Sequence, residues 1–176
     1  VTALADRLSA APPEAIYTAP TACGIQTGRI IANRCSVAPK RLDLLTNLDF
    51  GLWQGRLVSD IRSLQPRLYR QWQDDPWSVA PPEGELLEEA SGRVEDALER
   101  LFKRHPAGRI AVVVPPPLDA IVRWLVSGSP LGDLWQPNMA QDALAVLPVA
   151  AQWRIGGVPA SVTPASLSDQ APATAG

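Results

Sequence analysis

The sequence predicts a layered α/β fold, with helices on both sides of a mostly parallel sheet. Short apolar runs typical of buried strands alternate with longer stretches whose apolar residues recur every three or four positions. Helix and strand in alternation favour a parallel sheet, because parallel strands need a crossover connection between them. The clearest unit is the run Ile110 to Val114, followed by three prolines and an amphipathic stretch from Leu118, which together predict a strand, a tight turn and a helix.

The first half of the chain predicts helices and short strands in turn. Residues 1–10 predict the end of a helix, because Leu4 and Leu8 lie one turn apart. A β-prone run at 15–18 predicts a strand, and residues 24–34 predict a helix with small and apolar residues on one face. Residues 36–50 predict mostly loop, with a short strand near Arg41-Leu42.

The second half begins with a helical period between residues 57 and 72. Pro66 divides this stretch into two helices, since proline suits a first turn and breaks a helix interior. A longer helix is expected over 85–104, from the stripe of Leu87, Ala90, Val94 and Leu101.

The last predicted elements are a strand at 109–114, a helix at 118–128 and a strand near 143–149. Residues 1–155 are therefore expected to form one α/β domain. Residues 156–176 are rich in Gly, Pro, Ala, Ser and Thr and predict a disordered tail.

Composition narrows the class of protein. With 176 residues, 46% apolar residues and a net charge of −2, the chain has enough apolar residues for one core. The sequence has no dense run of basic residues, which argues against nucleic-acid binding. It also has no apolar run long enough to span a membrane. A single histidine, His105, and no Cys/His ligand spacing argue against a metal site, and no cofactor is predicted. Cys23 and Cys35 are separated by a predicted helix, so both are expected as free thiols, consistent with a cytoplasmic protein.

Several segments, taken in order, resemble the histidine phosphatase (phosphoglycerate-mutase-like) superfamily. The most specific is Leu48 to Gly55, which resembles the motif I-D-F-G-x-W-E-G. Residues 15–20 resemble its I-Y-S-S-P strand end, 25–28 its x-Q-T-A helix start, and 81–85 its P-P-G-G-E segment. Residues 109–135 follow its last βα unit without a gap.

The resemblance implies a phosphohistidine-dependent phosphatase or mutase. In that family a histidine of an R-H-G motif, after the first strand, attacks the phosphoryl group, cations offset its charge, and a carboxylic acid protonates the leaving oxygen. Here the chain begins at Val1, so the first strand is expected to be absent or upstream. Its absence would leave an internal sheet edge without a partner, and another chain of a homo-oligomer could cover that edge.

Other family positions carry replaced residues. Pro115 stands for the S-H-G-G histidine and Pro116-Pro117 for its two glycines, Cys23 for an arginine, and Asn47 for the usual acid. An amide cannot protonate a leaving group, and proline lacks an N–H donor. The resemblance thus implies a vestigial pocket, formed by Cys23, Asn47, Glu83, Pro115 and Pro116.

Other candidate residues favour structural roles. His105 is expected at a helix C-terminus rather than in catalysis, and Cys23 as a small packed side chain rather than a nucleophile. Glu83 and Glu85 are expected to cap a helix rather than recognise substrate. The six tryptophans are expected mostly to pack at the edges of the core, although Trp72 and Trp77, beside a Pro- and Asp-rich loop, could form a surface for a partner.

These positions favour a catalytically inactive protein that acts by binding or scaffolding, with an unknown protein or small-molecule partner. Two alternatives remain open: a phosphatase acting on phosphate monoesters with replaced or upstream catalytic residues, and a decayed gene fragment.

Overall fold

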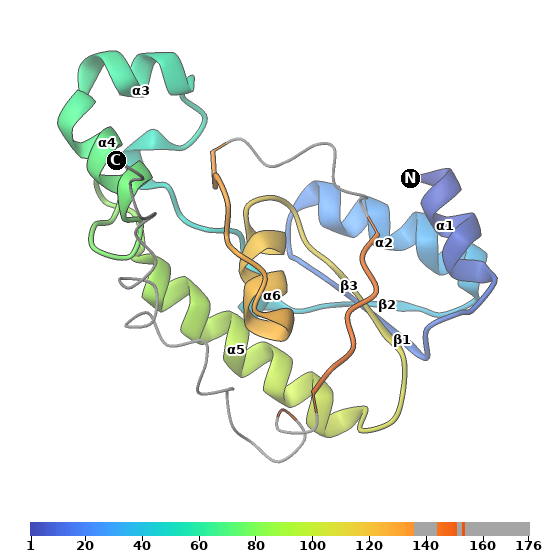
Figure 1. Cartoon of the computed structure of the whole chain (residues 1–176). Coiled ribbons are helices and arrows are strands. Elements are labelled where there is room, and N and C mark those ends of the chain that lie inside the picture. Colours follow the sequence, from blue (N-terminus) through green and yellow to red (C-terminus); the bar gives the residue numbers. More distant parts are fainter. Residues whose placement is uncertain (136–143, 151–152, 154–176) are drawn as a thin grey trace, which may run out of the picture.

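The computed structural model describes residues 1–135, 144–150 and 153. In this part of the chain three parallel strands form one sheet in the order β2-β1-β3 (Figure 1). The strands are β1 (Ala15–Thr18), β2 (Pro39–Arg41) and β3 (Ile110–Val113). The helices are α1 (Thr2–Ser9), α2 (Ala22–Cys35), α3 (Val58–Leu64), α4 (Pro66–Asp74), α5 (Leu87–Arg104) and α6 (Leu118–Ser127), with 3-10 turns η1 (Asp43–Leu45) and η2 (Gly51–Trp53).

The central strand β1 is buried on both faces, as its alternating contacts show. Ile16 packs with Ile31 of α2 on one face of the sheet, whereas Tyr17 packs with Leu101 of α5 on the other. Helices α1 and α2 therefore cover one face, and α5, followed by α6, covers the opposite face (Figure 1). The predicted α/β class with helices on both sides of a parallel sheet is confirmed.

Helix α2 lies close to the sheet because a glycine faces it. A Cβ atom on Gly28 would lie 2.3 Å from Cγ2 of Thr18, so any larger side chain would push the helix away. The helix begins at Thr21, whose side-chain oxygen accepts a hydrogen bond of 3.2 Å from the backbone N–H of Gly24.

Helices α3 and α4 extend beyond the N-terminal end of α5, away from the sheet (Figure 1). Helix α4 packs through an aromatic cluster in which Trp72 contacts Phe50, Trp53 and Trp135. Trp72 is only 2% exposed, so it packs in the core, as expected for most of the tryptophans, and takes no part in a surface for a partner. Trp77 is half-buried against Trp124, with ring centroids 4.9 Å apart.

Most predicted elements are confirmed, including the division at Pro66, which is the first residue of α4. The predicted strand near 143–149 is wrong, because residues 144–150 form no strand. Leu147 and Val149 pack on the core while Val146 is 79% exposed, so the alternating apolar pattern is real. A strand also needs a hydrogen-bonding neighbour, and none of the described strands pairs with this segment.

Strand β3 pairs with β1 alone in the described part of the chain, so its outer edge has no described strand beside it. All four of its residues are half-buried, in contrast to the four fully buried residues of β1. The predicted end of the domain at residue 155 and the predicted tail at 156–176 lie outside the described residues. Among the described helices, none has the length and apolarity required to cross a membrane.

Candidate functional site

The candidate site lies at the carboxyl edge of the sheet, where ligands commonly bind in parallel α/β folds. Strand β1 leads into α2 at this edge, and β3 leads into α6 through Pro115-Pro116-Pro117. The register aligns the strand ends, with Thr18 opposite Arg41 and Val113.

The proline turn is joined to the loop that follows η1. Nδ2 of Asn47 donates a hydrogen bond of 3.1 Å to the carbonyl oxygen of Pro116. The turn has no N–H groups of its own, but its carbonyls still accept, and the backbone N–H groups of Asp119 and Ala120 donate to Pro115 and Pro117. Oδ1 of Asn47 is buried and has no hydrogen-bond partner in the described part of the structure.

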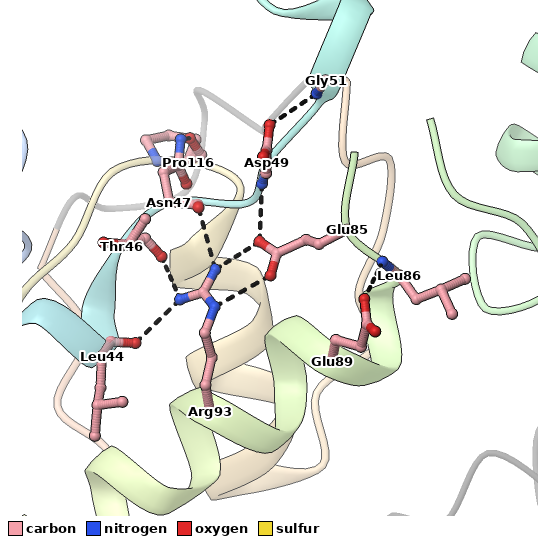
Figure 2. A network of polar contacts seen from close by, with 10 residues as sticks. All are labelled: Leu44, Thr46, Asn47, Asp49, Gly51, Glu85, Leu86, Glu89, Arg93 and Pro116. Carbon is pink, nitrogen blue, oxygen red and sulfur yellow. Dashed lines mark hydrogen bonds and ion pairs between the residues drawn. The ribbon is translucent and has the colours of Figure 1, made fainter. Parts of the chain in front are cut away.

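Asn47 is held in place by Arg93 of α5 (Figure 2). The Arg93 guanidinium donates to the backbone carbonyls of Leu44, Thr46 and Asn47, the first and last at 3.0 and 3.1 Å. Its remaining N–H groups donate to both carboxylate oxygens of Glu85, at 2.6 and 3.2 Å. All five guanidinium N–H groups are thus engaged within the protein, which excludes Arg93 as a free phosphate-binding cation.

Glu85 continues the network to Asp49. The backbone N–H of Asp49 donates to Oε1 of Glu85 at 2.8 Å, and the backbone N–H of Glu85 donates to the carbonyl of Asp49 at 3.0 Å. Our expectation that Glu85 caps a helix is therefore wrong, because its carboxylate is committed to Arg93. Glu89 has the capping role instead and accepts from the backbone N–H of Leu86 at 3.0 Å.

Gly51 and Gly84 allow the two loops of this network to touch. Gly51 has a φ of +50°, and a Cβ atom there would lie 2.1 Å from the carbonyl oxygen of Pro82. The adjacent Glu83 is exposed and has a φ of +58°, a conformation that favours glycine.

Of the five predicted pocket residues, the structure joins Asn47 to Pro116. Cys23 is exposed in the first turn of α2, with its sulfur 3.4 Å from Oγ1 of Thr21. Among the described residues no hydrogen bond links Cys23 or Glu83 to Asn47 or Pro116.

His105 lies away from this edge, as expected. It is the C-cap of α5 and precedes β3, at the amino end of the strands. Nδ1 of its ring pairs with the carboxylate of Glu14, and Nε2 lies 2.9 Å from the hydroxyl of Tyr17. Both ring nitrogens are occupied by protein groups, which fits a structural role.

Arg93 is the site residue that the sequence analysis missed. It lies three residues after Ala90 and four before Ala97, on the face of α5 that is otherwise buried. A charged side chain on a buried face needs partners, so this position was a usable signal.

A family model described as the histidine phosphatase superfamily (branch 1) matches residues 1–155. The chain belongs to this superfamily. Phosphoserine phosphatase 1 of Hydrogenobacter thermophilus is 31% identical to it over 110 residues, which cover 62% of this chain and 52% of that protein. The chain thus spans about half the length of this relative.

Solved structures agree on the fold. The structure of YhfR of Bacillus stearothermophilus matches with a TM-score of 0.68 at 24% identity, over 77% of this chain and 67% of that one. A mycobacterial glucosyl-3-phosphoglycerate phosphatase matches with a TM-score of 0.66 at 19% identity, over 76% of this chain and 66% of the other.

These relatives overturn our expectation of a catalytically inactive binding or scaffolding protein. One curated relative is named a phosphatase, and so is a solved structure of the same fold. The alternative that the sequence left open, a phosphatase with replaced or upstream catalytic residues, fits them better.

Proposed function

We propose that this chain forms the body of a phosphatase that acts on phosphate monoesters. The observation that carries the proposal is the superfamily match over residues 1–155, supported by a relative named for phosphatase activity. The site would be the carboxyl edge of the sheet, lined by Cys23, Asn47, Glu83, Pro115 and Pro116. The two unpaired cysteines support a cytoplasmic location.

The nucleophile would come from residues upstream of Val1, in a strand beside β3. The outer edge of β3 supports this place, since a parallel neighbour there would end at the same carboxyl edge as β1. A histidine there would attack the phosphorus, the ester oxygen would leave with the bonding electrons, and water would then hydrolyse the phosphohistidine to inorganic phosphate.

Asn47 would affect which leaving groups are tolerated. Its amide can donate a hydrogen bond to a leaving oxygen but cannot protonate it. In the adjacent network, Glu85 is held by Arg93, and Oδ1 of Asp49 accepts from the N–H of Gly51. Esters whose leaving groups need no proton, such as p-nitrophenyl phosphate, should therefore be hydrolysed faster than alkyl esters such as phosphoserine.

The test is hydrolysis by protein that includes the natural residues upstream of Val1. We expect turnover of p-nitrophenyl phosphate of about 1 per second or more, an ordinary enzyme rate, together with an acid-labile phosphohistidine. His105→Ala should retain the activity, because His105 lies at the other end of the strands. Absence of turnover and of phosphoenzyme would refute the proposal.

Two substitutions test which residues supply the proton donor and the nucleophile. Asn47→Glu should raise the rate with phosphoserine more than the rate with p-nitrophenyl phosphate, because it adds a proton donor. Cys23→Ser should leave the activity in place. Its loss would mean that a replaced nucleophile within this chain, rather than an upstream histidine, carries the reaction.

A further inference from the structure

Arg93 connects helix α5 to the loop that carries Asn47. It is 22% exposed and its partner Glu85 is 17% exposed, so the pair is largely shielded from water. An ion pair in such a place is retained only where further hydrogen bonds satisfy its remaining polar atoms. Here they do, since every guanidinium N–H has an acceptor.

The hydrogen-bond acceptors of Arg93 include more groups than are needed to neutralise the charge of its guanidinium. Three of them are backbone carbonyls within four consecutive residues, at Leu44, Thr46 and Asn47. Three carbonyls can converge on one guanidinium only if the chain curves around it (Figure 2). This curvature is present where η1 ends and the loop to Asp49 begins.

A side-chain hydrogen bond joins the curved loop to the opposite side of the site. Asn47, whose carbonyl is bound by Arg93, uses its side-chain amide to bind Pro116. The same residue is therefore fixed at its backbone by α5 and joined through its side chain to the turn before α6.

From these contacts we propose that Arg93, with Glu85, is the positioning residue that sets the place of Asn47 against the Pro115–Pro117 turn. A lysine could not replace it, because an ammonium group has three N–H groups and no planar fork with which to bind three carbonyls and a carboxylate together. The consequence for catalysis rests on the proposed phosphatase function, whereas the geometric claim does not.

The geometric claim is tested by nuclear magnetic resonance on ¹⁵N-labelled protein. The side-chain amide signal of Asn47 is assigned by its loss in Asn47→Asp. In Arg93→Lys we expect this signal to move toward the position of a solvated amide and its protons to exchange faster. Arg100→Lys, a matched change at an exposed position on the same helix, should leave the signal unmoved.

An Asn47 signal that is the same in Arg93→Lys and in the native protein would overturn the proposal. If Arg93→Lys does not fold, Glu85→Gln provides the same test, because it removes the charge that orients Arg93 while keeping the acceptor for Asp49. An unmoved Asn47 signal in a folded Glu85→Gln protein would then overturn the proposal.

The catalytic consequence is measured separately on the hydrolysing protein. Arg93→Lys should lower kcat about tenfold, the effect of one lost hydrogen bond, with KM changed less than about twofold. The same change in an Asn47→Ala background should have little further effect, because Arg93 acts through Asn47. Additive effects of the two substitutions would show that Arg93 does not act through Asn47. If no hydrolysis is found with any variant, the phosphatase proposal fails and the resonance experiment still decides the role of Arg93.

Discussion

Glu83 carries backbone strain that its side chain does not relieve. Its φ of +58° is unfavourable for any residue with a Cβ atom, and the side chain is exposed. Glu83 lies in the segment that resembles P-P-G-G-E, at the position of the first glycine of that motif. Glycine would adopt this conformation without the steric cost.

We expect Glu83→Gly to raise the free energy of unfolding by about 1 kcal/mol, the approximate cost of a left-handed conformation for a residue with a Cβ atom. Glu83→Ala is the control, because it removes the carboxylate and keeps the strain. Denaturant unfolding of the three proteins measures both effects. An equal gain in Glu83→Ala would assign the effect to charge.

The carboxyl group of Glu95 on α5 has a pKa that is shifted by its surroundings. Burial raises the pKa of its carboxyl group, and the negative charges of Glu99 and Asp96 raise it further. A raised pKa in the folded state means that the folded protein binds this proton more tightly than the unfolded chain does. Glu95 therefore lowers stability above its folded pKa. This penalty decreases as the pH falls below that pKa and is absent below the pKa of the unfolded chain.

Glu95→Gln should consequently stabilise the protein at pH 7. The gain should be a few tenths of a kcal/mol, because much of the group is screened by solvent. Thermal unfolding of both proteins between pH 7 and acidic pH measures it, and the two melting temperatures should converge as the pH falls. A gain that grows on acidification would mean that the sign of the shift is wrong.

At the scale of elements, two helical glycines show how the surroundings decide whether a glycine-to-alanine substitution stabilises or destabilises the protein. Gly28 of α2 faces Thr18, with 2.3 Å available to a new Cβ atom, whereas Gly92 of α5 has nothing within 4 Å. Gly28→Ala should destabilise the protein by about 1–3 kcal/mol through overpacking. Gly92→Ala should stabilise it by about 0.5–1 kcal/mol through helix propensity. Differential scanning calorimetry would contradict this account if both variants moved in the same direction.

The elements that the sequence predicted well are those with local causes. Pro66 begins α4 because a ring without an N–H suits a first turn, and the apolar stripe of α5 follows its helical period. The prediction of a strand near 143–149 was wrong because the alternation of apolar residues is a local property of the sequence, whereas pairing with another strand depends on distant residues. The predicted capping role of Glu85 was wrong for the same reason, since its partner Arg93 and the loop at 44–47 meet only in the folded chain.

At the scale of the whole molecule, the outer edge of β3 has no neighbouring strand among the described residues. A strand edge with no partner leaves backbone N–H and C=O groups unpaired, at about 1–3 kcal/mol for each one that is buried. Such an edge also invites association between chains. The half-buried residues of β3 fit an edge that is only partly covered.

On the proposed function, a protein that includes the strand upstream of Val1 should melt at a higher temperature and associate less at high protein concentration. Calorimetry and sedimentation velocity measure the two effects, and a scrambled segment of equal length is the control. If residues 1–176 alone prove monomeric and cooperative, and the added residues change neither property, the edge of β3 needs no partner.

The sheet order has a further consequence, for how the chain reaches its fold. β1 pairs with β2 after a short helical crossover, but its other neighbour, β3, lies more than ninety residues later in the chain. Closing such a long loop costs entropy before the pairing contributes, so folds with many distant contacts form slowly. We expect α1, β1, α2 and β2 to assemble first. The face of β1 that carries Tyr17 would then stay exposed until α5 packs on it. Pulsed hydrogen exchange during refolding should protect the amides of β2 before those of β3, and the reverse order would contradict this sequence of events.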